Sequence, residues 1–262
     1  MENSIEIIKH KNYNEPSVFS PENLLREARR QKSIKNCGAP KICVLDPDGD
    51  IVKYLLKENR AVLNKCWACY HTVLYNFKLN NIEFGIIGCA VGGSFAVLLA
   101  EQLFVSGCSL LISITSSGLI THPKKDTHYI LIKKALRDEG TSYHYLPPDI
   151  ESKINPRILK ELSPLFRKRE LNIEPGDSWT TDAPYRETQT AIKYAEKKKI
   201  NAVEMEAASL YAFAKAKNKN VVCFAHLTNT MAQHEGDFEK GIENGSVDSL
   251  RIIYNTAKTL IT

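Results

Sequence analysis

Short apolar runs alternate with amphipathic segments along most of the chain. The runs have the length of buried strands, and several are followed by a turn rich in Gly, Asp or Pro and then by a helical pattern. Predicted strands lie at residues 42–45, 84–88, 109–114, 129–132, 201–203 and 221–226. Predicted helices begin near residue 51 and cover residues 95–106, 156–169, 207–217 and 249–260. This order predicts an α/β fold with a mostly parallel or mixed sheet and helices on its faces.

The first 36 residues differ from the rest because they are polar and contain no such strand. Ser20 followed by Pro21 predicts a capped helix start within this segment. We therefore expect an N-terminal arm over residues 1–36 and one catalytic domain over residues 37–262. A chain of 262 residues is within the range of a single α/β domain, so the length requires no second one.

Composition and charge narrow the class of protein. The apolar fraction of 43% and the charged fraction of 25% are ordinary for globular proteins. The net charge of +5 comes from scattered Lys and Arg with short clusters at 167–169 and 197–199, which favours a solvated surface over nucleic-acid binding. No run is long and apolar enough for a membrane helix, and the polar N-terminus lacks a signal-peptide core. We expect a cytoplasmic protein without nucleic-acid or membrane partners.

The seven cysteines are irregularly spaced, so we expect buried thiols rather than disulfides. Cys66 and Cys69 have the spacing of a redox or zinc pair, but no second Cys or His pair matches them. A place in the core is the favoured interpretation, and the sequence predicts no metal site and no cofactor.

Two glycine-containing turns follow predicted strands. Residues 88–94 end in Gly-Gly-Ser with Ser94, and residues 115–118 contain Ser116. Backbone amides at such turns bind anions or sugar oxygens, although the turns equally allow a helix to pack closely on a strand. The first turn lacks the Gly-x-Gly-x-x-Gly pattern, which argues against a dinucleotide site.

A pair of acids lies where a predicted strand enters a helix. Glu204 and Glu206 flank Met205 and place hydrogen-bond acceptors beside an apolar surface, as recognition of a sugar's vicinal hydroxyls requires. Acids in a first helical turn are also favoured by the helix dipole. The pattern alone leaves both interpretations open.

Residues 203–208, Val-Glu-Met-Glu-Ala-Ala, followed by Leu-Tyr at 210–211, resemble the ribose motif of the nucleoside phosphorylase family. The resemblance is to its uridine phosphorylase and hexameric purine nucleoside phosphorylase branch and extends over roughly residues 40–260. Residues 137–145, 178–185 and 227–229 are also similar in order and spacing. The resemblance implies that Glu206 binds the ribose hydroxyls and that Met205 packs on the sugar. It also implies a single α/β domain with a central mixed sheet partly closed into a barrel, and a homo-oligomer whose sites borrow residues from a neighbouring subunit.

The chain departs from this family where phosphate is bound. Ile51 and Ser113 stand where family phosphorylases carry phosphate-binding arginines, and the first loop holds Asp46, Asp48 and Asp50. Two carboxylates about 4 Å from a phosphate dianion would repel it by several kcal/mol. A carboxylate can instead activate a water molecule, so Asp46 and Asp48 are the predicted catalytic residues and Asp50 the predicted helix cap. All three also suit a turn.

The residues expected near the base give a second departure. Asn229 replaces an acid that many family members use to protonate the base, and an amide donates a hydrogen bond but no proton. Asp182 either supplies that acid or caps a turn. Trp179 and Tyr185 either stack on the base or belong to the core, and His226 has the surroundings of a structural residue. A purine or deazapurine-type base fits this set.

The sequence therefore predicts a nucleosidase that uses water to release a base and ribose. The alternative is a phosphorylase that forms ribose 1-phosphate, with phosphate held by Lys65 or by an arginine of a neighbouring subunit. A nucleoside-binding protein without turnover is the third possibility.

Overall fold

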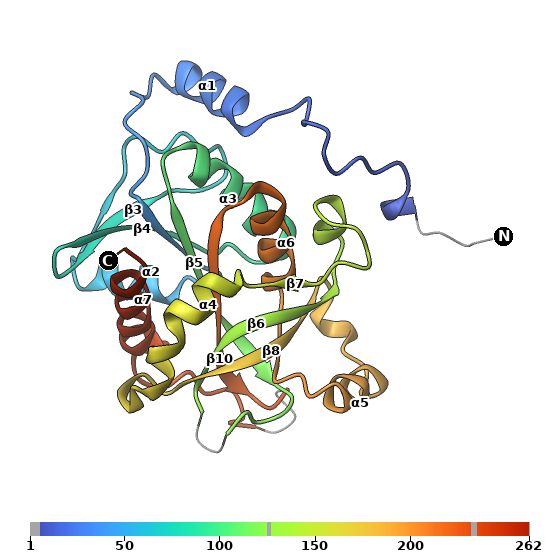
Figure 1. Ribbon diagram of the computed structural model, residues 1–262. Helices are drawn as coiled ribbons and strands as arrows, with labels where there is room; N and C mark the ends of the chain where they lie inside the picture. The colour runs from blue at the N-terminus through green and yellow to red at the C-terminus, as the bar shows by residue number, and fades with distance from the viewer. Residues whose placement is uncertain (1–5, 125–126, 232–234, 262) are drawn as a thin grey trace.

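A mixed sheet of ten strands forms the centre of the protein (Figure 1). This computed structural model describes residues 6–124, 127–231 and 235–261. The strands are β1 (Ile42–Asp46), β2 (Ala61–Leu63), β3 (Tyr75–Leu79), β4 (Ile82–Gly88), β5 (Leu110–Leu119), β6 (Tyr129–Asp138), β7 (Ser152–Lys153), β8 (Ile173–Thr181), β9 (Ala202–Glu204) and β10 (Asn220–Asn229).

Part of this sheet closes into a barrel. The order β10-β6-β8-β9-β5 returns to β10, because β5 and β10 also pair, in parallel. From β5 the sheet continues outward through β1, β4, β3 and β2, and β1 is parallel to both β4 and β5. The single α/β domain with a partly closed mixed sheet, implied by the family resemblance, is confirmed.

Helices cover the sheet on more than one side (Figure 1). α3 packs against α6, and α7 packs against both α2 and α4. The α-helices are α1 (Pro21–Lys32), α2 (Asp50–Lys57), α3 (Gly93–Val105), α4 (Pro156–Leu162), α5 (Gln189–Lys197), α6 (Ala207–Lys217) and α7 (Ser246–Ile261). Short 3₁₀ helices are η1 (Glu6–Ile8), η2 (Thr141–His144), η3 (Ser163–Arg167), η4 (Arg169–Leu171), η5 (Pro184–Arg186) and η6 (Ile242–Gly245).

One predicted helix is divided. The segment 156–169 forms α4 only as far as Leu162 and continues as η3. Pro164 accounts for this break, because its ring lacks the N–H of a continuing α-helix and clashes with the carbonyl one turn earlier. The prediction of one continuous helix was therefore wrong.

The N-terminal segment is attached to the domain through α1. Ser20 Oγ accepts a hydrogen bond from the Asn23 amide, as the predicted cap requires. Leu25 and Ala28 are buried with Ala68 in a small apolar cluster of their own. The boundary at residue 36 between an arm and a catalytic domain stays a prediction.

A disulfide joins Cys37 to Cys66, whose Cα atoms lie 5.4 Å apart. The expectation that the cysteines are thiols was wrong for this pair, because pairing depends on Cα proximity in the fold and not on spacing in sequence. The other five cysteines are free, and of these only Cys89 is exposed.

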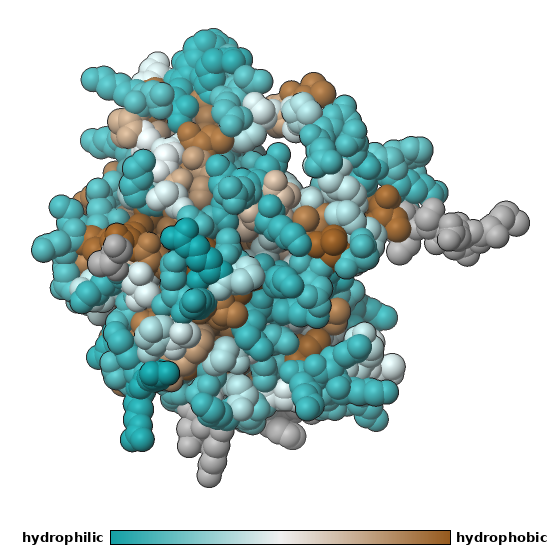
Figure 2. All heavy atoms as spheres, viewed as in Figure 1, coloured by the Kyte–Doolittle hydropathy of each residue, from teal (hydrophilic) through white to brown (hydrophobic). Residues whose placement is uncertain are grey.

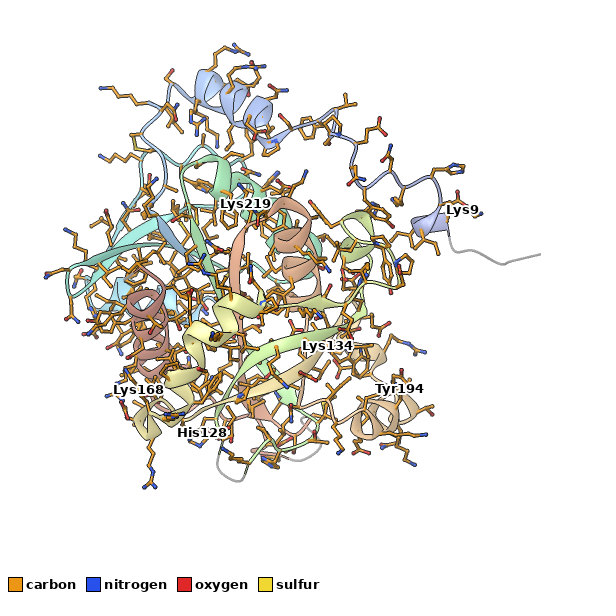
Figure 3. The ribbon with its side chains drawn as sticks, viewed as in Figure 1. Lys9, His128, Lys134, Lys168, Tyr194 and Lys219 are labelled. Carbon is orange, nitrogen blue, oxygen red and sulfur yellow. A yellow bond between two sulfur atoms is a disulfide. The ribbon has the colours of Figure 1, made fainter. Side chains whose placement is uncertain are left out.

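The surface carries scattered charge. The lysines labelled in Figure 3 come from separate parts of the chain: Lys9 after η1, Lys134 on β6, Lys168 between η3 and η4, and Lys219 before β10. The face in Figure 2 is mainly hydrophilic, with apolar residues exposed in separate places. In the ranges that the structure describes, no helix is long and apolar enough to cross a membrane.

Candidate active site

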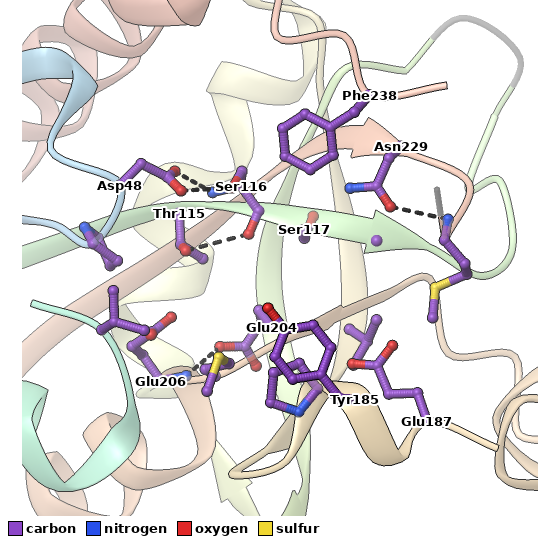
Figure 4. A pocket seen from close by; sticks show the side chains of 17 residues that line it. Asp48, Thr115, Ser116, Ser117, Tyr185, Glu187, Glu204, Glu206, Asn229 and Phe238 are labelled. Carbon is purple, nitrogen blue, oxygen red and sulfur yellow. Dashed lines mark hydrogen bonds between the residues drawn. The ribbon is translucent and has the colours of Figure 1, made fainter. Parts of the chain in front are cut away.

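A cavity of about 360 Å³ lies beyond the carboxyl ends of β1, β5 and β10. These three strands run parallel, so their ends meet at one edge of the sheet, where α/β proteins bind ligands. Figure 4 shows Asp48 and Glu206 at one end of the cavity and Asn229 and Glu187 at the other. We call these the Asp48 end and the Asn229 end.

Glu206 is a buried acceptor with spare capacity. Only 2% of the residue is exposed, and its Oε1 accepts a hydrogen bond of 2.7 Å from the Gly92 amide. Its Oε2 has no hydrogen-bond partner among the described residues. Burial, followed by the charge of Glu204, raises the pKa of Glu206 to about 8. Because an unpaired buried acceptor costs free energy, Oε2 is suited to accept a hydrogen bond from a ligand.

Glu204 also lines the cavity, but its hydrogen bonds go to the protein. Its Oε2 accepts from the amides of Glu206 and Ala207, each at 2.7 Å, and so caps the start of α6. Its Oε1 accepts from the hydroxyls of Ser178 and Thr180. Burial raises the pKa of Glu204. These contacts fix the turn from β9 into α6 that holds Met205 and Glu206 at the cavity.

The aspartates of the first loop have separate tasks. Asp46 is 1% exposed and lies outside the cavity lining. Its carboxylate accepts from the amides of Gly49 and Val52, at 3.1 and 2.9 Å, at the start of α2. Burial raises the pKa of Asp46 to about 7, and the charges of Asp48 and Asp50 act in the same direction. Asp46 therefore stabilises the start of α2, and the catalytic role predicted for it stays a prediction.

Asp50, the predicted cap, is the first residue of α2 and makes no capping bond. Its Oδ2 accepts a hydrogen bond of 2.7 Å from Lys240 Nζ. The prediction was wrong because Asp46, at the end of β1, already accepts the amide hydrogens at this helix start.

Asp48 lines the cavity in a fixed position. Its Oδ2 accepts from the Ser116 amide at 2.8 Å, and its Oδ1 accepts from the Ser116 hydroxyl at 2.7 Å (Figure 4). Lys240 Nζ lies 3.3 Å from Oδ1. Ser116, predicted to bind substrate, therefore lines the cavity and also orients Asp48.

Besides Asp46, three residues predicted for the site do not line the cavity. Ser94 is exposed in the first turn of α3. Trp179 is 4% exposed, packs in an apolar cluster with Val203, and donates from Nε1 to Asp138 at 2.9 Å, so it belongs to the core. Asp182 accepts a hydrogen bond from the Gly140 amide at 2.8 Å, which supports the turn interpretation.

At the Asn229 end, the Asn229 Oδ1 accepts from the Met231 amide at 2.9 Å, and its Nδ2 donates to Thr228. Tyr185, predicted as a stacking residue, lines the cavity and is 99% exposed. Glu187 lines it as well, and burial raises the pKa of Glu187 to about 7.

Sequence reasoning missed Glu187, Phe238 and Lys240. Glu187 lies two residues after the predicted Tyr185, and that proximity was the available signal. Phe238 lines the cavity with 53% of its surface exposed, and no periodic pattern surrounds it or Lys240. His226 is structural, as expected: its ring stacks on Tyr129 with centroids 4.3 Å apart, and burial lowers the pKa of His226 to about 4.

The cavity is lined by several acidic residues. Among the described residues, its lining contains Asp48, Glu187, Glu204 and Glu206 and neither Lys nor Arg. Ile51 and Ser113 are buried, at 4% and 2% exposure. Among the residues that the structure describes, no group of three or more His, Cys, Asp and Glu side chains could hold a metal ion.

Residues 41–256 match the family model of the phosphorylase superfamily. The chain belongs to this superfamily. A phosphorylase-superfamily domain therefore covers the sheet, α2 to α6 and most of α7.

Solved structures show the same fold. A uridine phosphorylase from Vibrio fischeri, in complex with 6-hydroxy-1-naphthoic acid, is 19% identical, with a TM-score of 0.70 over 87% of this chain and 93% of that one. A purine nucleoside phosphorylase from Toxoplasma gondii, in complex with immucillin-H, is 12% identical, with a TM-score of 0.71 over 86% and 92%.

A curated relative comes from Acanthamoeba polyphaga mimivirus and is described as an uncharacterized protein. It is 30% identical over 166 residues, which are 63% of this chain and 62% of the viral protein. The match therefore spans less than two thirds of that relative.

Proposed function

We propose that the protein hydrolyses the N-glycosidic bond of a nucleoside in this cavity. Membership of the phosphorylase superfamily supports cleavage of nucleoside glycosidic bonds in general. The observation that favours water over phosphate is the acidic Asp48 end, where Asp48 and Glu206 lie in a cavity whose described lining has no Lys or Arg. Phosphate entering there would meet the Asp48 carboxylate, which repels a phosphate dianion by several kcal/mol at about 4 Å.

The sugar is assigned to the Asp48 end. The unpartnered Oε2 of Glu206 accepts a hydrogen bond from a ribose hydroxyl, which satisfies the buried acceptor. Met205 is half-buried in the cavity wall and packs against the sugar ring. Gly92 holds the other oxygen of Glu206, so that the carboxyl plane is fixed before the ligand arrives.

Asp48 activates the water. The Ser116 amide and hydroxyl hold its carboxylate at the cavity surface. Asp48 takes one proton from water as the water oxygen forms a bond to C1′, and the electron pair of the C1′–N bond leaves with the base. The leaving nitrogen takes a proton from Glu187, and Asp48 and Glu187 then return to their starting states by proton exchange with solvent, so the products are a free base and ribose.

The base is assigned to the Asn229 end, where Tyr185 and Phe238 offer aromatic faces to a planar ring. The Asn229 amide donates a hydrogen bond to the departing base. Because its pKa is about 7, Glu187 is partly protonated at neutral pH and donates its proton to the base, which is one of the two roles that the sequence left open for Asp182. A purine or deazapurine-type ring suits these groups.

Phosphorolysis is the competing function, and Lys240 is the observation in its favour. Its ammonium group reaches Asp48, but it is already paired with the carboxylates of Asp48 and Asp50. Lys65, the cation considered from sequence, is exposed after β2 and does not line the cavity. A neighbouring subunit's arginine and a homo-oligomer remain predictions.

The test is a panel of purine, deazapurine and pyrimidine nucleosides incubated with the purified protein, with and without phosphate, in heavy-oxygen water. Hydrolysis gives ribose that carries one heavy oxygen and needs no phosphate. Strict dependence on phosphate, with ribose 1-phosphate as product, would establish phosphorolysis instead. Saturable nucleoside binding without either product would identify a binding protein.

A further inference from the structure

Lys240 connects two walls of the cavity that are far apart in sequence. It follows Phe238, which lines the cavity, and reaches the loop between β1 and α2. Its Nζ lies 2.7 Å from Asp50 Oδ2 and 3.3 Å from Asp48 Oδ1, and only 16% of its side chain is exposed. The same ammonium group lies 5.7 Å from the ring centroid of Phe238.

The pairing is mostly shielded from water. The side chains of Asp48 and Asp50 are 27% and 13% exposed. Burial lowers the pKa of Lys240, but the hydrogen bond to Asp50 and the charges of both aspartates outweigh it, so that its pKa is raised. Lys240 therefore remains a cation at neutral pH, and its removal would take a counter-charge away from carboxylates that are largely shielded from water.

Lys240 contacts Asp48 from a different element than Ser116 does. Ser116 holds Asp48 from β5, whereas Lys240 holds Oδ1 from the segment after β10. Without Lys240, the carboxylate keeps only the contacts to one residue and loses its neighbouring cation.

We infer that Lys240 is a positioning residue, which fixes the Asp48 carboxylate for water activation and ties the Phe238 wall to it. This inference rests on the proposed function, in which Asp48 activates water. Lys240 acts through Asp48 and does not touch the reacting atoms.

Several titratable groups lie around Asp48 besides Lys240. Asp46 and Asp50 belong to its own loop, and Asp50 also lies 3.6 Å from Lys53 of α2. Glu206 and His226 each interact electrostatically with Asp48 from other elements. All five are present in each variant below unless named, so a change in pH dependence reports on Lys240.

The test compares Lys240→Met with Lys240→Arg and with Lys57→Met. Lys57 makes a control, because it holds the same segment to α2 through Glu243, at 2.9 and 3.1 Å, away from Asp48. We expect Lys240→Met to lower kcat roughly 10- to 100-fold, since a misplacement of about 1 Å costs on the order of 100-fold. Its acid limb of kcat/KM against pH moves to higher pH, because the ionised carboxylate has lost a cation. Lys240→Arg restores most of the rate, and Lys57→Met matches the wild type.

A double variant distinguishes the loss of Asp48 positioning from the effect of leaving the Asp50 carboxylate without Lys240. Lys240→Met removes the closer of the two cations beside Asp50 and leaves it only Lys53, 3.6 Å away, whereas Lys240→Met/Asp50→Asn also removes the charge of Asp50. A double variant that remains slow supports positioning of Asp48, whereas recovery of the rate overturns it. A Lys240→Met profile that coincides with that of Lys57→Met also overturns it.

Asp48→Asn distinguishes this inference from the proposed function. If Asp48→Asn keeps wild-type turnover, the assignment of Asp48 fails and the role of Lys240 fails with it. If Asp48→Asn is inactive while Lys240→Met is fully active with an unshifted acid limb, only the inference about Lys240 is wrong. Circular dichroism melting of each variant verifies that the protein compared is folded.

Discussion

Replacing Glu206 by Gln should make the protein more stable and less active. The substitution keeps the shape of the side chain and an oxygen for the Gly92 amide, while it removes a buried ionisable group. The folded-state pKa of about 8 lies above the ordinary value of 4.5, which applies to the unfolded chain. Folding is therefore favoured by this group's protonation at low pH, and stability is lost as pH rises from about 4.5 to 8.

The magnitude follows from the same two values. Each unit of pKa difference corresponds to about 1.4 kcal/mol, so between pH 5 and pH 8 Glu206 lowers the free energy of unfolding by about 3 kcal/mol. Glu206→Gln has no such loss. The stability of the variant relative to the wild type should therefore rise by about 3 kcal/mol across this interval.

Urea unfolding of wild type and variant at pH 5 and pH 8 measures this difference. Glu196→Gln is a matched control, because Glu196 is an exposed residue of α5. Its stability relative to the wild type should not change with pH. If the wild type and Glu206→Gln differ by the same amount at both pH values, the burial argument for Glu206 is wrong.

Activity should move in the opposite direction. Above pH 8, where Glu206 is ionised, a hydrogen bond to its carboxylate contributes about 1.5–3 kcal/mol, so losing the Oε2 acceptor should lower kcat/KM for a nucleoside measured there roughly 10- to 100-fold. Unchanged kcat/KM in Glu206→Gln would exclude the ribose contact.

Three further substitutions test other parts of the structure. Glu187→Gln should lower kcat about 100-fold or more. In the wild type, kcat should fall above about pH 7, as Glu187 loses its proton. A steady-state pH series in which the kcat of the wild type does not fall there would exclude this role for Glu187. Cys37→Ser should lower the free energy of unfolding, measured in urea, by about 3 kcal/mol, and a reductant should lower the stability of the wild type alone. Equal stability of variant and wild type would count against the Cys37–Cys66 disulfide. Trp179→Phe should leave KM for the nucleoside unchanged, because the indole donates its hydrogen bond to Asp138 outside the cavity. A large rise in KM would show that Trp179 contributes to nucleoside binding.

β1, β4 and α6 could be predicted because their apolar patterns are local, whereas the short strands β2 and β3 were not predicted. β8 could not, since it contains Pro175 and Gly176, which are typical of a turn. The barrel accommodates them: β6 shifts register opposite Gly176, and a Cβ on Gly176 would come within 2.8 Å of Asn201 Oδ1. This adjustment depends on strands from other parts of the sequence.

In the candidate site too, residues within local motifs could be predicted, whereas roles that depend on distant parts of the chain could not. Asp48, Glu206 and Asn229 were identified from motifs, and all three line one cavity. The sequence did not separate Asp46 from Asp48, because their difference depends on which carboxylate faces the start of α2. The role of Lys240 could not be predicted from the sequence, since it lies 190 positions from its partner Asp50.

β5 pairs with β1, β9 and β10, so it belongs to both the barrel and the open sheet. Ser116, which orients Asp48, is therefore on a strand held from several directions, whereas Tyr185 and Glu187 lie on or beside the short helix η5. Changes in η5 alter no sheet pairing. We therefore expect that exchanging this turn changes the preference for the base proposed to bind beside it, while the groups assigned to the sugar and the water remain on an unaltered scaffold.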